Sequence, residues 1–312
     1  MRRGRAFRRG RRTRDCGGQF QPAFQVHVRL HGHRYERADS VLRQGATEVK
    51  GLLIYDAVGF ARNSWFAKRL EQACKKQGLD LNLCILTSET AHLPFVPDFA
   101  AVRVANPALT KKLEAAGVRT FNNHKTSFVA NDKWQTYLFL KENGFRVMET
   151  EEGFSEKLPF PYVLKSVDGH GGSEVFLVKT KEELCKLKAE YASGRRFVSQ
   201  KLCSSPGRDL RVYVLGGKVL AGAMRSSSSD FRSNYSLGGT AEIVSVPQNI
   251  ASVAERIAAE LQSDFVGVDF IFDGDDAVVN EVEDVVGTRM LYDLTDLDAA
   301  EEYAKYIAKK LK

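Results

Sequence analysis

Residues 267–283, GVDFIFDGDDAVVNEVE, read as two short apolar strands joined by the acidic turn DGDD. Successive side chains of a strand point to opposite faces, so a hairpin centred on Asp275 places Asp269 opposite Glu281, with Glu283 two residues further along the same face. Carboxylates this close repel one another unless a cation neutralises them, and oxygen ligands of this kind suit Mg2+ or Mn2+. The alternative is a hydrated acidic hairpin, because carboxylates are mostly surface residues.

A glycine-rich loop lies upstream of this hairpin. Residues 161–178, PYVLKSVDGHGGSEVFLV, read as a strand that carries Lys165, a loop with Gly169, Gly171 and Gly172, and a returning strand. Glycines let backbone N–H groups approach phosphate oxygens, and the lysine supplies a positive charge. The loop joins two strands and lacks the GKS or GKT of a P-loop. The alternative is a long turn that uses glycine only for positive φ.

Charged side chains also alternate with apolar strands in residues 197–234. A single exposed arginine is usually hydrated surface. Several arginines just before a carboxylate hairpin instead indicate a site for phosphate or carboxylate groups, which a guanidinium binds through two parallel hydrogen bonds. The polar side chains of this segment that we single out are Asp209, Arg211, Arg225, Arg232 and Asn234.

The composition is that of an ordinary globular protein. The chain has 312 residues, of which 43% are apolar and 27% charged, and it is long enough for two or three domains. No apolar run approaches the roughly 18 residues needed to span a bilayer, so we expect no membrane partner. Five widely spaced cysteines without a CxxC pair form no disulfide or zinc framework. A reducing, cytoplasmic location is the simplest expectation.

The net charge of +7 is confined to the first 48 residues, which hold 12 arginines, no lysine and 4 acidic residues. The rest of the chain holds 34 basic and 35 acidic side chains, so its body is not basic. An arginine tail can bind nucleic acid through phosphate neutralisation, and Arg-rich, acid-poor segments also occur in targeting peptides. We favour a disordered extension without a folded role, and we do not expect nucleic acid as a partner.

The body opens with alternating strands and helices. GLLIYDA reads as a buried strand, followed by a helix over 65–78 that Asn63 or Ser64 can cap, and by a strand over 80–86. FAAVRV at 99–104 and a helix over 107–117 continue the alternation, so residues 49–130 are predicted to form a small α/β domain. Further helices are predicted over 131–144, capped by Asn131 or Asp132, and over 250–263 and 298–312.

Taken in order, these motifs resemble the ATP-grasp superfamily, and most closely its RimK-type group of glutamate and amino-acid ligases. The resemblance covers essentially all of residues 50–312. It implies an α/β (α+β) fold in three parts: an N-terminal α/β domain over 49–130, a central subdomain over 131–203 whose glycine loop forms a flap, and a C-terminal subdomain over 204–312 with the metal site. ATP would lie between two antiparallel sheets. The motifs that carry it are NDKWQTYLFLKENG, YVLKSVDGHGGSEVFLV, DLRVYVLGGKV, DFRSN, SLGG, GVDFIF and NEVEDVVG.

The resemblance also implies site residues. The backbones of Lys201 and Leu202 would meet adenine, Asp209 would lie near the ribose, and Arg211 or Arg225 would stabilise an acyl phosphate. Asp269, Glu281 and Glu283 would hold Mg2+ or Mn2+, with two ions expected. The full set of positions for ATP is Lys133, Lys165, Gly169, Gly171, Gly172, Lys201, Leu202, Asp209, Arg232, Ser233 and Asn234.

The implied activity is ATP-dependent ligation of a carboxylate to an amine, expected to be an amino acid, with release of ADP and phosphate. The chain departs from the RimK-type pattern at two places. Glu283 stands where these enzymes commonly have Asn and would add a negative charge to the metal site, and VVGTRMLY replaces a Pro-Gly loop, which leaves the substrates open. The alternative is a nucleotide-binding sensor or partner protein without ligase turnover. A homo-oligomer is compatible with the sequence.

Removal of residues 1–48 tests their assignment as an extension. A chain that begins at Val49 should fold and keep its ATP-dependent activity, because every motif above lies downstream. Circular dichroism melting and phosphate release measure the two properties. Failure of the shortened chain to fold would refute the assignment.

Overall fold

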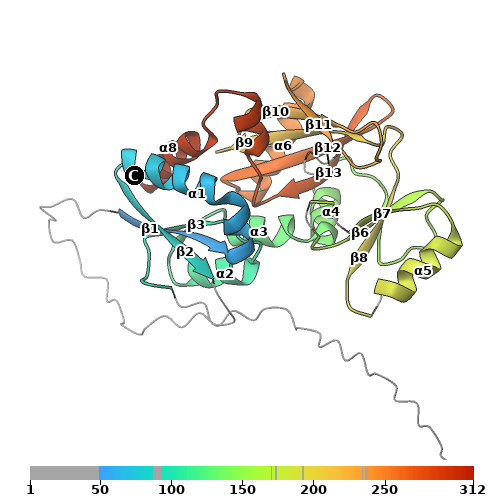
Figure 1. The fold of residues 1–312 in the computed structure, drawn as a ribbon, viewed down its shortest axis with the longest axis horizontal. Helices are drawn as coiled ribbons and strands as arrows, with labels where there is room; N and C mark the ends of the chain where they lie inside the picture. Colours follow the sequence, from blue (N-terminus) through green and yellow to red (C-terminus); the bar gives the residue numbers. More distant parts are fainter. Residues whose placement is uncertain are drawn as a thin grey trace, which may run out of the picture.

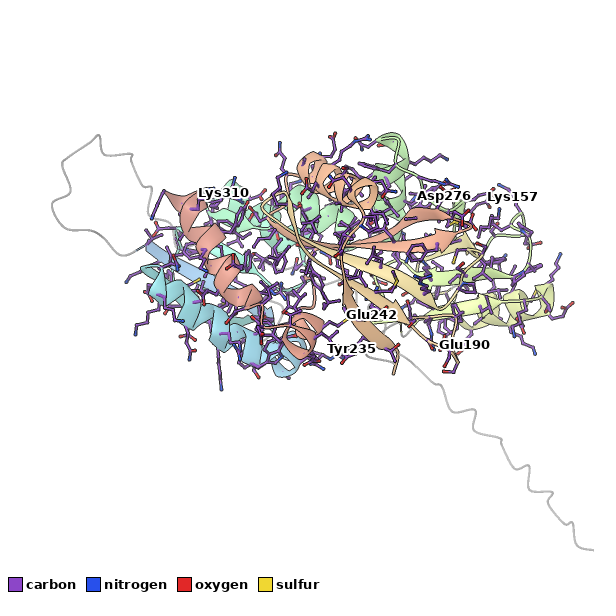
Figure 2. All side chains as sticks on the ribbon, turned by 90° about the horizontal axis from the view of Figure 1, so that it is seen from above. Lys157, Glu190, Tyr235, Glu242, Asp276 and Lys310 are labelled. Carbon is purple, nitrogen blue, oxygen red and sulfur yellow. The ribbon has the colours of Figure 1, made fainter. Side chains whose placement is uncertain are left out.

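The computed structural model describes residues 49–86, 93–169, 171–172, 174–191, 193–233, 235 and 238–312. These residues build three sheets (Figure 1): a parallel sheet at one end of the molecule, a four-stranded antiparallel sheet at the other, and a five-stranded sheet between them. Viewed from above (Figure 2), Lys310 and Lys157 mark the two ends. The Arg-rich segment 1–48 lies outside the described residues. Within them, no helix has the length and apolarity needed to cross a membrane.

The N-terminal sheet has the strand order β2-β1-β3-β4, with all neighbours parallel. Helices cover both of its faces, which explains why the central strands β1 and β3 are buried along most of their length. Its elements are β1 (Val49–Asp56), α1 (Ala57–Lys76), β2 (Leu79–Leu86), β3 (Phe99–Val102), α2 (Pro107–Ala115) and β4 (Arg119–Phe121), followed by α3 (His124–Ala130).

Helix α1 begins earlier than the sequence predicted. The carboxylate of Asp56 accepts a hydrogen bond from the backbone N–H of Gly59 and caps the helix, whereas Asn63 lies within it at a kink with non-helical φ and ψ. The Asn63 side chain donates to the carbonyl of Gly59 at 3.0 Å, which stabilises this kink. The predicted cap at Asn63 or Ser64 was therefore wrong. Helix α3, which Asn123 caps, was not predicted.

The small antiparallel sheet has the order β5-β8-β6-β7. Tyr162 and Leu164 of β6 pack with Leu184 of α5 on one face, so Lys165 points from the other face. The predicted strand, glycine loop and returning strand are confirmed as the antiparallel pair β6 and β7. The elements are β5 (Thr150–Glu152), β6 (Tyr162–Ser166), β7 (Val175–Val178), α5 (Lys181–Tyr191) and β8 (Phe197–Lys201).

The large antiparallel sheet has the order β11-β10-β9-β12-β13. Its apolar face packs against α4 and α6, through side chains such as Val212, Val268 and Val282. The predicted helix over 131–144 is α4, capped by Asp132. The elements are α4 (Lys133–Glu142), β9 (Arg208–Leu215), β10 (Lys218–Ser226), β11 (Thr240–Val244), α6 (Gln248–Leu261), β12 (Phe265–Asp273), β13 (Asp276–Glu283), α7 (Arg289–Leu294) and α8 (Ala299–Leu311).

The hairpin of β12 and β13 contains a bulge. Asp273 pairs with Asp276 and Phe270 with Val279, but the next pair is Asp269 with Glu281, so Asn280 is an extra residue of β13. The predicted pairing of Asp269 with Glu281 is confirmed, although the turn is not centred on Asp275. Without the extra residue, Asp269 would oppose Asn280, and the two glutamates would point to the other face of the sheet.

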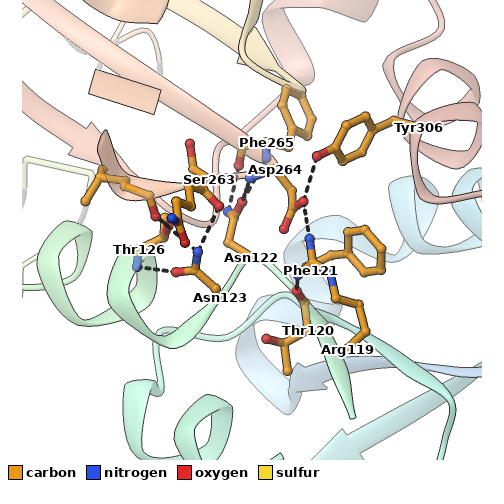
Figure 3. Close-up of polar contacts among 12 residues, drawn as sticks. Arg119, Thr120, Phe121, Asn122, Asn123, Thr126, Ser263, Asp264, Phe265 and Tyr306 are labelled. Carbon is orange, nitrogen blue, oxygen red and sulfur yellow. Dashed lines mark hydrogen bonds and ion pairs between the residues drawn. The ribbon is translucent and has the colours of Figure 1, made fainter. Parts of the chain in front are cut away.

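Asn122 joins the N-terminal sheet to the large sheet (Figure 3). Its side-chain oxygen accepts hydrogen bonds from the backbone N–H groups of Asp264 and Phe265, at 2.6 and 2.8 Å. Its amide nitrogen donates to the carbonyl of Phe265 and to the carboxylate of Asp284, both at 2.8 Å. Asn122 is 4% exposed, so one buried carboxamide satisfies backbone groups at the start of β12 in place of a neighbouring strand.

Replacing this carboxamide should destabilise the protein strongly. Asn122→Ala leaves buried N–H groups and the Asp284 carboxylate without partners, and the expected loss is about 3 to 5 kcal/mol in the free energy of unfolding. Urea denaturation followed by tryptophan fluorescence measures it. Asn82→Ala is the matched control, because Asn82 makes a local hydrogen bond of 3.3 Å to the carbonyl of Asp80. Equal losses in the two variants would contradict the role given to Asn122.

Candidate active site

A cleft separates the small sheet from the polar face of the large sheet. It contains about 890 Å³ of empty space, including the part open to solvent. Its walls come from β6 and β8 on one side and from β9, β10, β12 and β13 on the other. The glycine loop and Arg232 also contribute to its walls, and Lys133, the first residue of α4, lines it as well.

The cleft brings together most residues predicted for the site. Arg211 does not line it: the side chain is buried beneath the cleft, in contact with Asp269 and Glu283. Asn234 lies outside the described residues. The predicted residues that line the cleft are Lys133, Lys165, Gly169, Gly171, Gly172, Lys201, Leu202, Asp209, Arg225, Arg232, Ser233, Asp269, Glu281 and Glu283.

Two arginines hold Asp269 from both sides. Strand register places Asp269 beside Arg211, whose Nε and Nη2 donate to the two carboxylate oxygens at 2.8 and 2.7 Å. Nη2 of Arg225 donates to Oδ2 of Asp269 at 2.8 Å. Burial alone would raise the pKa of Asp269, but the two guanidinium groups hold this pKa well below its ordinary value. Asp269 is therefore an ionised carboxylate that is already neutralised by protein cations.

Arg225 links Asp269 to Asp209. Its Nε and Nη2 donate to the two oxygens of Asp209, both at 2.6 Å, in a bidentate pair. The hydrogen bonds of Arg225 with described residues thus use Nε and Nη2, and those of Arg211 use the same two atoms. Arg225 also lines the cleft, and Nη1 is the guanidinium nitrogen that makes no hydrogen bond with the described residues.

Glu281 lies in an ion pair with Lys133. The distance from Lys133 Nζ to Glu281 Oε1 is 3.0 Å, and the same ammonium donates to the carbonyl of Gly169 at 2.6 Å. Lys133 and Lys165 lower the pKa of Glu281 below its ordinary value, outweighing the opposite effect of burial. Lys133 therefore connects the carboxylate hairpin to the glycine loop.

Glu283 contacts Arg211 through Oε1, at 2.5 Å from Nη2. Burial raises the pKa of Glu283 above its ordinary value, and the nearby carboxylate of Asp269 adds to this effect, although Arg211 opposes it. The side chain is 31% exposed, against 5% for Asp269. Glu283 is thus the more accessible of these two carboxylates.

Lys165 is held by two carboxamides that sequence reasoning missed. Its Nζ donates to Gln200 Oε1 at 2.7 Å and to Asn280 Oδ1 at 2.8 Å. Burial lowers the pKa of Lys165 to about 8, with a smaller contribution from the charge of Lys133 and an opposing one from Glu281. The broken alternation of β13, in which Val279 and Val282 enter the same core three residues apart, is the signal that could have revealed Asn280.

Arg232 holds the glycine loop from the opposite side. Its guanidinium forms a bidentate pair with Asp230, and its Nη1 donates to the carbonyl of Gly172 at 2.8 Å. The loop is thus contacted at Gly172 by a cation from the connection between β10 and β11, and at Gly169 by Lys133 of α4. These contacts place two charged donors beside the backbone that is expected to approach phosphates.

The donor chemistry of the hairpin fits a hard metal ion, although the carboxylates now face protein cations. Within the described residues, no three His, Cys, Asp or Glu side chains converge as a preformed metal site. The hydrogen bond and ion pair described above use Oε1 of Glu283 and Oε1 of Glu281, and both glutamates line the cleft. Two carboxylate oxygens and water satisfy the preference of Mg2+ for oxygen ligands.

Comparison with known proteins defines the class. The model of the RimK-like ATP-grasp domain matches residues 132–307, more than half of the chain. The chain therefore belongs to the RimK-like ATP-grasp family, as its motifs indicated. Members of this family are ligases, and the protein is an enzyme that forms carbon–nitrogen bonds.

Individual proteins are similar to the chain in sequence or in fold. The chain is 30% identical to an uncharacterized MG011 homolog of Mycoplasma pneumoniae, over 78% of this chain and 86% of the relative. It is 30% identical to N-acetylaspartylglutamate synthase A of Homo sapiens, over 73% of this chain but 62% of the synthase. A D-alanine–D-alanine ligase from Bacillus anthracis, solved with ATP, shares the fold with a TM-score of 0.64 at 17% identity, over 85% of this chain and all of that structure.

The low pKa of Lys165 predicts how nucleotide affinity changes with pH. The ammonium is fully charged well below pH 8 and loses its proton above it, so ATP affinity should be flat near pH 7 and fall from about pH 8 upward, by up to about tenfold per pH unit. Isothermal titration calorimetry with Mg2+ and a non-hydrolysable ATP analogue measures the profile. Lys165→Arg, which stays charged, should flatten it. An unchanged profile in that variant would exclude Lys165 as the titrating group.

Proposed function

We propose that the protein joins a carboxylate to the amino group of an amino acid through an acyl phosphate. The γ-phosphoryl group of ATP passes to the carboxylate oxygen, and ADP is released. The amine nitrogen then attacks the acyl carbon, the carbon–oxygen bond to phosphate breaks, and the surplus proton of the amine passes to solvent. The observation that supports this proposal best is the composition of the cleft. Lysines suited to phosphates (Lys133 and Lys165) and carboxylates suited to a metal ion (Glu281 and Glu283) line the same cavity.

The cleft residues suit positioning and charge stabilisation more than covalent chemistry. Cys203 lines the cleft, but burial raises the pKa of its thiol, which disfavours a nucleophilic thiolate. Lys133 and Lys165 would orient the phosphates, and the glycine loop would cover them. Arg225 would stabilise the acyl phosphate through its Nη1, while Arg211 would hold Asp269 and Glu283 in place. Lys201 and Leu202 would meet adenine at the strand end of β8.

For the metal we propose Glu281 and Glu283 as the main ligands, because both line the cleft and a protein cation contacts each through Oε1, whereas Asp269 accepts through both of its oxygens. Asp269 would become a ligand only if the metal ion replaced one of the two arginines that donate hydrogen bonds to it. When bound, Mg2+ or Mn2+ would offset the charge that develops on the transferred phosphoryl group.

The charges of the site bear on the number of metal ions that would accompany ATP. Four cations (Lys133, Lys165, Arg211 and Arg225) face four carboxylates (Asp209, Asp269, Glu281 and Glu283), and we call these eight residues the charge network. The network is neutral as it stands. ATP carries about four negative charges, which two divalent cations would offset in full and which one would offset together with Lys201 and Arg208, the exposed cations that also line the cleft.

Glutamate is the first amine to test, because the name of the human synthase contains glutamate as the acceptor part of its product. The loop over 285–292 departs from the RimK-type pattern, so the identity of the carboxylate substrate has to be found by experiment. Hydroxylamine can replace the amine and trap any acyl phosphate as a hydroxamate. A panel of N-acylated amino acids, tricarboxylic acids and short peptides should then include at least one acid that forms a hydroxamate and releases ADP with Mg2+. ATP cleavage that no acid stimulates would overturn the proposal.

Glu281→Gln should abolish turnover while the fold stays intact, because it removes a charge from the metal ligands without changing volume. Loss of at least about 100-fold in ADP release is expected, with an unchanged melting temperature. Glu255→Gln is the control, since Glu255 lies on α6 and pairs with the exposed Lys218. Activity close to that of the unmodified enzyme in Glu281→Gln would rule out the metal assignment.

A further inference from the structure

The two carboxamides that hold Lys165 belong to different sheets. Gln200 lies on β8, the neighbour of the strand that carries Lys165, so their hydrogen bond stays within the small sheet. Asn280 lies on β13, so its hydrogen bond with Lys165 crosses the cleft from the large sheet. A lysine ammonium has donors but no acceptor, which requires the oxygen of each carboxamide to face it.

The bulge accounts for the position of Asn280. Asn280 has no partner on β12, because Asp269 pairs with Glu281 and Phe270 with Val279. Asn280 lines the cleft directly beside Glu281, instead of alternating with it. The extra residue of β13 therefore gives the large sheet a second polar side chain at this point.

A neutral acceptor has a specific advantage at this position. A carboxylate in place of Asn280 would form an ion pair with Lys165, and a phosphate would have to compete with that pair. A carboxamide orients the ammonium but does not cancel its charge. Lys165 thus keeps its charge available to an incoming anion, although burial lowers its pKa.

We propose that Asn280 is a positioning residue for the nucleotide. It holds Lys165 across the cleft in the orientation that meets ATP phosphates, and it sets the distance between the small sheet and the metal hairpin. The inference rests on the nucleotide role proposed for Lys165. It goes further because it assigns a function to the extra residue of β13, next to Glu281.

The test compares the affinity for a non-hydrolysable ATP analogue with Mg2+, measured by calorimetry. Lys165→Met should weaken binding, and Asn280→Leu should weaken it about tenfold, the size expected for one hydrogen bond to a charged group. In kinetics, Asn280→Leu should raise KM for ATP without raising KM for the carboxylate substrate. Gln200→Leu is the matched variant: it removes the same kind of hydrogen bond within one sheet, so its effect should be smaller than that of Asn280→Leu.

A double variant separates a positioning role from a structural one. If Asn280 acts through Lys165, a variant that combines Lys165→Met with Asn280→Leu should bind the ATP analogue no more weakly than Lys165→Met alone. Additive losses, or a lower melting temperature with unchanged affinity, would overturn the inference. Should Asn280→Leu fail to fold, Asn280→Ala removes the carboxamide without adding a branched side chain, and the same comparison applies.

The same data distinguish failure of this inference from failure of the proposed nucleotide role. Unchanged affinity in Lys165→Met would show that Lys165 is not part of the nucleotide site. It would refute the nucleotide role of Lys165 and the positioning role of Asn280 together. Weaker binding in Lys165→Met but not in Asn280→Leu would overturn the positioning role alone.

Discussion

One extra residue in β13 determines what the cleft contains. The turn between β12 and β13 sets a register in which the carboxylates of β13 would face the apolar core under α6. Asn280 shifts that register by one, so Glu281 and Glu283 turn toward the cleft while Val279 and Val282 both remain in the core. Burying two unpaired carboxylates would cost several kcal/mol each. The apolar core and the polar cleft thus both depend on this bulge.

Elements whose cause is local could be predicted from sequence. Asp132 caps α4 through backbone N–H groups two and three residues away, and the glycine loop between β6 and β7 follows from its own residues. The ordered motifs then identified the family. The predicted start of α1 was wrong because the residue that caps this helix, Asp56, is also the last residue of a buried strand.

The contacts that shape the site could not be predicted in this way. Lys165 and Asn280 are 115 residues apart, and Arg211 and Asp269 are 58 apart, so their meeting depends on how sheets pack and on strand register. Charge pairing also differs from expectation. The carboxylates of the hairpin were expected to be neutralised by a metal ion, whereas Asp269 accepts hydrogen bonds from two arginines. The residue pattern of one strand does not show which cations the neighbouring strands place beside it.

The neutral charge network has a consequence for how the nucleotide arrives. A cleft lined by one sign of charge accelerates association through its long-range field, and such rates fall steeply with ionic strength. Here the buried charges cancel over a few ångströms, and the exposed Lys201 and Arg208 at the rim are screened by salt. Any acceleration of nucleotide capture therefore comes from these exposed rim cations and should weaken as the salt concentration rises, whereas salt screens the contacts inside the cleft much less.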